Sequence, residues 1–158
     1  MKKVRIFLLL MTMLSVIASC VDKGPDPDFR IEPGNELIQP EDEHIVDLPF
    51  LQQNVKNAKV TFEWNESTAM DGGFVSYELL FDMEDGDFTS PIDTRASSLT
   101  GSGKILSLNV KAMNEIALKS GVAAGETVRL KWTVRASKGI KGSIYSQRNT
   151  ITVRTLPQ

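Results

Sequence analysis

Hydrophobic and polar residues alternate along much of the chain from residue 44 onward, which is the pattern of β-strands with one buried face. The two tryptophans, Trp64 and Trp132, fall on the inner faces of separate strands, where they are expected to hold two sheets together. Strong strands are expected at 59–64, 75–82, 128–135 and 150–154, and weaker ones at 44–49, 92–98 and 104–109. About seven short strands separated by glycine-containing turns predict an all-β antiparallel sandwich whose outer faces meet water.

One helix is expected to interrupt the strands, between Asn109 and Gly121. The Asn109 side chain can cap the free amides of the first turn, and Gly121 can supply the left-handed residue that ends a helix. The intervening apolar or small residues recur at helical spacing on one narrow face: Met113, Ile116, Ala117 and Ser120. This helix should lie across an open end of the sandwich.

The N-terminus predicts a bacterial lipoprotein signal peptide at residues 1–19. Lys2, Lys3 and Arg5 form a positive start, and residues 6–19 form an uncharged apolar run. The run is too short for a transmembrane helix, which needs about 20 apolar residues, and fits the apolar core of a secretory signal. Small residues precede Cys20, as in a lipobox, so this single cysteine is the expected lipid-attachment site.

A linker is expected to follow, at residues 20–43, and a β domain at residues 44–158. The stretch after Cys20 holds four of the seven prolines and eight acidic residues. Proline and like charges both favour an extended chain, so this segment is interpreted as a semi-rigid stalk between the lipid and the domain.

The net charge of the mature chain argues against two classes of binding partner. Removal of the signal peptide leaves 15 of the 18 basic side chains beside all 20 acidic ones, a formal charge of −5. Nucleic-acid binding usually requires a stripe of basic residues, and electrostatic adhesion to anionic lipid requires a basic surface. We therefore expect the protein to bind neither nucleic acid nor anionic lipid headgroups. It is expected to be attached to the membrane through the lipid on Cys20 alone.

The order of motifs resembles the N-terminal domain of the SusE family of outer-membrane lipoproteins. The resemblance covers roughly residues 40–155. It is carried by the lipobox and by the following segments in order: Val60-Thr61-Phe62-Glu63-Trp64, Val75-Ser76-Tyr77-Glu78-Leu79-Leu80-Phe81-Asp82, Asn109-Val110-Lys111-Ala112-Met113-Asn114 with Gly121-Val122, and Val128-Arg129-Leu130-Lys131-Trp132-Thr133-Val134-Arg135-Ala136 followed by Ser146 and Thr150-Ile151-Thr152-Val153.

The resemblance implies an immunoglobulin-like or fibronectin-III-like fold and a place on the outer membrane of Bacteroidetes, beside a SusC-like transporter and a SusD-like glycan-binding protein. An acidic start after the lipidated cysteine resembles surface-export signals, so the cell surface is the expected location and the periplasmic face the alternative. In this family, starch is held by later carbohydrate-binding domains. This chain stops at Gln158, where those domains would begin, so no glycan-contacting residue is transferred. The chain is expected to be a single-domain relative or the product of a truncated gene.

The residues offer no constellation for catalysis or for a metal. His44 is the only histidine and stands next to the linker, and Cys20 is used for lipid. The acidic segment 82–87 fails the calcium-loop spacing, because its glycine falls at the fifth position and Asp93 occupies the position of the required glutamate. We therefore expect no enzyme activity, no cofactor and no metal.

Several functions remain open from the sequence. The leading hypothesis is an accessory spacer or docking module of a polysaccharide-uptake system. The alternative is a glycan-binding module, for which Phe74, Phe88 and Tyr145 are the only candidates for an exposed aromatic platform. An adhesin or fibre subunit and a hydrolase are further alternatives. The adhesin hypothesis depends on strand addition at an unpaired edge, which sequence does not locate.

Overall fold

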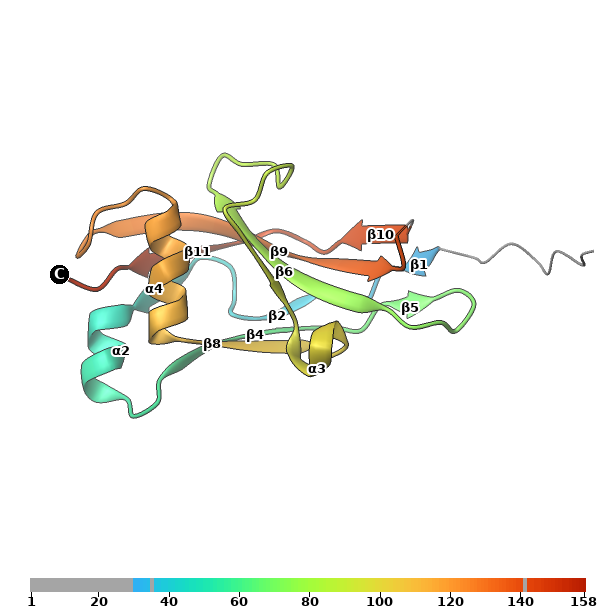
Figure 1. Cartoon of the computed structure of the whole chain (residues 1–158), viewed down its shortest axis with the longest axis horizontal. Coiled ribbons are helices and arrows are strands. Elements are labelled where there is room, and N and C mark those ends of the chain that lie inside the picture. The colour runs from blue at the N-terminus through green and yellow to red at the C-terminus, as the bar shows by residue number, and fades with distance from the viewer. Residues whose placement is uncertain (1–29, 35, 141) are drawn as a thin grey trace, which may run out of the picture.

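Two β-sheets pack face to face in the computed structural model, with two helices at one end and a small extra strand pair at the other (Figure 1). The structure describes residues 30–34, 36–140 and 142–158. The first sheet has the order β2–β4–β8 and the second the order β3–β11–β9–β6–β7, with β10 added on β9. The predicted all-β sandwich is confirmed, with one parallel pair, β3 and β11, in an otherwise antiparallel arrangement.

The strands are more numerous than the expected seven, since eleven occur among the described residues. The first sheet is built from β2 (Leu37–Gln39), β4 (Lys59–Trp64) and β8 (Ile105–Asn109). The second contains β3 (His44–Asp47), β6 (Ser76–Met83), β7 (Asp93–Ala96), β9 (Thr127–Lys138), β10 (Gly142–Tyr145) and β11 (Asn149–Arg154). A separate pair consists of β1 (Ile31–Glu32) and β5 (Thr68–Ala69).

An aromatic cluster joins the two sheets, as the alternation predicts. Phe62 of β4 meets Phe81 of β6 and Trp132 of β9 edge to face, with ring centroids 5.3 and 5.0 Å apart. Trp64 tilts against Tyr77, with centroids 5.8 Å apart. All five side chains are buried, so both tryptophans stabilise the contact between the sheets.

The predicted helix is α4 (Val110–Lys119). Asn109 Oδ1 accepts a hydrogen bond from the Ala112 amide at 2.8 Å, and Gly121 follows the helix at φ +87°. Met113, Ile116 and Ala117 are fully buried, so the expected apolar face is confirmed. The helix lies across the end of the sandwich, next to α2 (Figure 1).

The strand predicted at 44–49 is corrected by the structure, because β3 ends at Asp47 and a helix, α2 (Leu48–Asn54), begins directly after it. The Asp47 side chain accepts a hydrogen bond from the Phe50 amide at 3.0 Å and so caps the helix. Pro49 fits the first turn, where its missing amide hydrogen costs nothing. Leu48 is buried and fastens the helix to the core. A four-residue segment, α3 (Ser98–Gly101), precedes β8, and its Leu99 and Thr100 have left-handed backbone conformations.

Strand pairing begins ahead of residue 44, where the boundary between linker and domain was predicted. The chain is already paired at β1 and β2, and Ile31 and Pro40 are buried. Proline is compatible with the ends of short edge strands, where no amide is needed for a ladder. The proposed signal peptide, Cys20 and the linker up to residue 29 lie outside the described residues.

Candidate functional site

The N-terminal part of the domain changes sheet, and this leaves two strand edges open. Strand β2 pairs with β4 only at Leu37–Trp64 and Gln39–Glu63. After Pro40 the chain crosses to the other sheet, where β3 pairs in parallel with β11, starting with His44 opposite Ile151. Among the described strands, none pairs with the β2 side of residues 59–62, and none pairs with the outer edge of β3.

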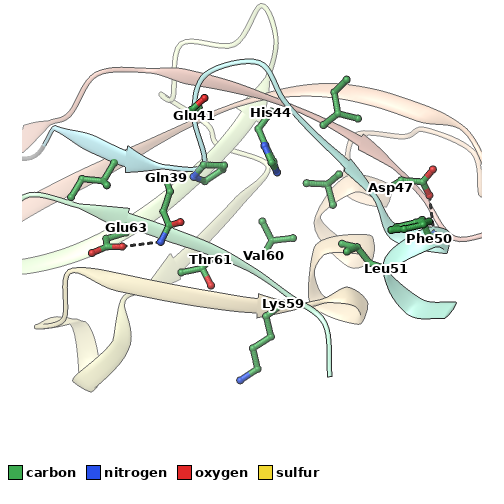
Figure 2. Close-up of a pocket in the computed structure, with 14 residues that line it drawn as sticks. Gln39, Glu41, His44, Asp47, Phe50, Leu51, Lys59, Val60, Thr61 and Glu63 are labelled. Atoms are coloured by element: carbon green, nitrogen blue, oxygen red, sulfur yellow. Dashed lines mark hydrogen bonds between the residues drawn. The ribbon is translucent and has the colours of Figure 1, made fainter. Parts of the chain in front are cut away.

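A groove of about 960 Å³ lies between these two edges, and we call it the β3–β4 groove (Figure 2). Val46 and Val60, which belong to the core, form its floor. Figure 2 shows the side chains of His44 and Val60 entering it from β3 and β4, while Lys59 points away. The remaining lining residues come from β2, the crossover, β3, α2 and β4: Ile38, Gln39, Pro40, Glu41, Ile45, Asp47, Phe50, Leu51, Thr61 and Glu63.

The mouth of the groove carries apolar side chains that no described residue covers fully. Ile45 is 72% exposed, Phe50 58% and Ile38 46%. Single exposed apolar residues are ordinary on protein surfaces, but a group of them beside a hollow is typical of an interaction site. The groove therefore combines an apolar lining with accessible strand backbone.

The backbone of β4 offers hydrogen-bonding groups to this groove. The Trp64 amide donates to the Lys104 carbonyl at 3.1 Å, on the β8 side, and the Asn65 amide donates to the Glu36 carbonyl at 2.8 Å, on the β2 side. Successive residues of a strand direct their amide and carbonyl groups to opposite sides. By this alternation the backbone groups of Lys59 and Thr61 face the groove.

Carboxylates outnumber cations around the groove. Glu41, Asp47 and Glu63 line it with Lys59 as the one lysine or arginine among its described lining residues. Gln39 donates to Glu63 at 2.8 Å, which orients that carboxylate without neutralising it. The Asp47 carboxylate forms an ion pair with Arg154, with Oδ2 3.4 Å from Nη1. The groove is consequently weakly acidic.

Asp42 holds the crossover against the second sheet. Its Oδ1 accepts hydrogen bonds from the Thr150 amide at 2.6 Å and from the Thr150 hydroxyl at 2.9 Å. These bonds, the amide bond foremost, lower the pKa of the Asp42 carboxyl. The charged carboxylate thus fixes the start of β3 beside β11.

This contact makes part of the stability dependent on pH. A carboxyl whose pKa is lowered by folding stabilises the native state above its unfolded value, near pH 4, and loses that contribution as pH falls through the lower folded value. We expect Asp42→Asn to lower stability at neutral pH and to flatten the decline below about pH 4. Urea unfolding at several pH values measures this, with Asp85→Asn, an exposed carboxylate, as the control. An unchanged acid decline in the Asp42 variant would contradict it.

The aromatic residues predicted as a glycan platform do not share one hollow. Phe74 is 67% exposed and lines a hollow with Ser67 and Tyr77, at the β5 end of the sandwich. Tyr145 is 47% exposed and lines another hollow with Pro33 and Gln147. Phe74 and Tyr145 therefore remain separate exposed rings.

The structure corrects the prediction of Phe88 as a glycan-platform residue. Its side chain is only 5% exposed and cannot present an open ring to a ligand. Its amide donates to Asp82 Oδ2 at 2.8 Å, and the Arg148 guanidinium lies 5.6 Å from its ring centroid. Both contacts fold the acidic loop back onto the sheet. Sequence alone placed Phe88 in a loop, but it carried no sign that the loop closes over its own aromatic residue.

Arginine side chains on the outer face of β9 form ion pairs with neighbouring carboxylates. The Arg129 guanidinium lies 3.0 Å from Glu43 Oε1 and 3.3 Å from Glu84 Oε1. Arg135 Nε donates a hydrogen bond to Glu78 Oε2. Within the described ranges, no three His, Cys, Asp or Glu side chains converge as metal ligands would. In the same ranges no helix has the length and hydrophobicity to cross a bilayer.

Comparison with known protein families finds a match to most of the described domain. Residues 28–135 match the family model described as SusE outer membrane protein, from just before β1 into β9. No curated protein matches the chain.

Proposed function

This chain belongs to the SusE outer membrane protein family, and we propose that it acts there as a non-enzymatic docking module of a polysaccharide-uptake system. Membership of the family places it with the Sus system of the outer membrane. Its finer role is our proposal, in which the sandwich binds other proteins of the system rather than transforming a substrate.

One observation carries the docking role. The β3–β4 groove brings open strand edges and exposed Ile45 and Phe50 together on one surface. Such a combination suits a protein partner, because strand edges hydrogen-bond other backbones and apolar side chains bury against them. Elsewhere among the described residues, Phe74 and Tyr145 are exposed aromatic rings in separate hollows.

We further propose that the protein is held by a lipid on Cys20 and displayed at the cell surface. The signal at residues 1–19 and the small residues before Cys20 support the anchor. The first described strand, β1, lies at the opposite end of the domain from α2 and α4 (Figure 1). A lipid anchor ahead of β1 would join the domain at the end opposite the helices.

A partner-retention experiment tests the docking role. The mature lipoprotein, extracted in mild detergent through an affinity tag, is expected to bring down a SusC-like transporter and a SusD-like protein in stoichiometric amounts, as quantified by mass spectrometry. A tagged, unrelated outer-membrane lipoprotein of the same cells is the control. Consistent absence of both partners would overturn the proposal.

A glycan-binding role is the second candidate, favoured by the exposure of Phe74 and Tyr145. Calorimetric titration with starch and other plant and host glycans distinguishes it from docking. A saturable heat that is lost in Phe74→Ala or Tyr145→Ala would favour glycan binding. Phe88→Ala is unsuitable as a site variant, because Phe88 is buried.

A further inference from the structure

We propose that the β3–β4 groove binds an extended, basic peptide segment of a partner protein, which adds as a strand to the open edge of β4. This inference rests on the proposed docking function and specifies the chemistry of the partner. It follows from three properties of the groove: its backbone edge, its apolar lining and its charge.

The backbone edge requires an extended ligand. Strand β4 is paired with β8 along Lys59–Glu63, but β2 accompanies it only at its C-terminal end. The groups of Lys59 and Thr61 that face the groove are spaced as in any strand, two residues apart. Four residues of β4, from Lys59 to Phe62, span roughly 13 Å at about 3.3 Å per residue. A segment of similar length can take the place that β2 leaves vacant.

The apolar lining selects the side chains of the segment. A strand laid along β4 directs alternate side chains inward, to Val46, Val60 and Leu51, which line the groove. Exposed Ile45 and Phe50 lie on the opposite wall, on β3 and α2. Apolar residues at every second position of the segment would bury against both walls.

Charge determines the remaining positions and the kind of partner. Glu41, Asp47 and Glu63 give the groove a negative balance, so lysine or arginine beside the apolar residues is favoured. The same balance disfavours a second copy of this chain. An isologous contact would bring these carboxylates against their own copies, and like charges in an interface are costly. The occupant is therefore a segment of a different protein.

The probe is a panel of acetylated, amidated octapeptides in which valine alternates with threonine and both ends carry lysine or, for comparison, glutamate. The detergent-solubilised mature protein is titrated with each peptide by calorimetry. We expect saturable binding of the lysine-ended peptides, at least about tenfold tighter than that of the glutamate-ended ones. A peptide with a central proline, which cannot form the ladder, should not bind.

Variants and hydrogen exchange localise the binding. Ile45→Lys should weaken it at least about tenfold, whereas Ile140→Lys, at a nearly fully exposed isoleucine elsewhere, should not. The Thr61 amide should exchange more slowly when the peptide is bound, while the Phe62 amide, directed to β8, should change little. The exchange measurement does not depend on any variant folding.

Each outcome decides the matter. Tight binding of lysine-ended peptides with protection of Thr61 supports strand addition. Failure of the whole panel, binding unaffected by Ile45→Lys, protection elsewhere, or dimerisation through the groove overturns it. Loss of this inference is distinguishable from loss of the docking function: if wild type and Ile45→Lys both retain the SusC-like and SusD-like partners, docking stands and uses another surface.

Discussion

Replacing Phe62 by alanine is expected to lower the free energy of unfolding by about 3–5 kcal/mol, the usual cost of removing a buried phenylalanine. Phe62 is fully buried and its ring is the common partner of Phe81 and Trp132. Edge-to-face pairs are worth about 0.5–1.5 kcal/mol beyond area burial, so the value should fall toward the upper end. Because the contacts bridge two sheets, the cavity cannot close without moving one of them.

Urea unfolding followed by tryptophan fluorescence measures this loss, and both tryptophans report on the region affected. Phe74→Ala is the matched control, because the same side chain is removed from an exposed position and should change stability by less than about 0.5 kcal/mol. A loss below about 1.5 kcal/mol for Phe62→Ala would show that the sheets are joined mainly by other contacts.

Replacing Cys20 by serine is expected to abolish attachment of fatty acid and to remove the protein from the outer-membrane fraction. Serine lacks the thiol that would carry the diacylglycerol. Each buried CH₂ of an acyl chain contributes about 0.8 kcal/mol, so loss of the chains changes membrane partitioning by many orders of magnitude. The folded domain should be unaffected, since the substitution lies ahead of the described residues.

Incorporation of labelled palmitate and density separation of the two membranes measure this effect. Val21→Ala, next to the cysteine, is the control and should retain label and location. An uncleaved Cys20→Ser precursor held in the inner membrane by residues 6–19 also agrees with the prediction, because it lacks lipid and is missing from the outer membrane. Labelled Cys20→Ser protein would contradict the lipid-attachment site.

The long alternating strands were predictable because burial on one face leaves a period of two in the sequence. Leu130, Trp132 and Val134 show this in β9, and all three are fully buried. The helix α4 was predictable for a similar reason, since Asn109 and Gly121 mark its ends. Local chemistry and periodicity suffice where an element is long enough to repeat its pattern.

Short elements could not be predicted from the sequence, because two or three residues are too few to show a hydrophobic period. Strands β1 and β2 are such cases, and the prolines directly after them, Pro33 and Pro40, suggested a stalk. Helix α2 did leave a signal: Asp47 followed two residues later by Pro49 is a cap with proline in the first turn. The apolar residues on both sides of Asp47 instead favoured a strand that continues to residue 49.

The candidate site could not be predicted from the sequence, because it arises from pairing between segments that are far apart in the chain. No local pattern tells that β2 accompanies only the end of β4, or that the chain then joins β11. The identity of the open edges is a property of strand order. Burial of Phe88 likewise depends on a loop returning to Asp82 and Arg148.

The parallel pairing of β3 with β11 has a mechanical consequence. In Figure 1, β1 lies at one end of the long axis and the C-terminus at the other, with β11 running toward the C-terminal end. A pull between these ends draws His44 and Arg154 in opposite directions along two hydrogen-bonded strands. The bonds then bear the load in shear and must fail together, instead of opening one at a time. Such a joint resists extension along the long axis of the domain.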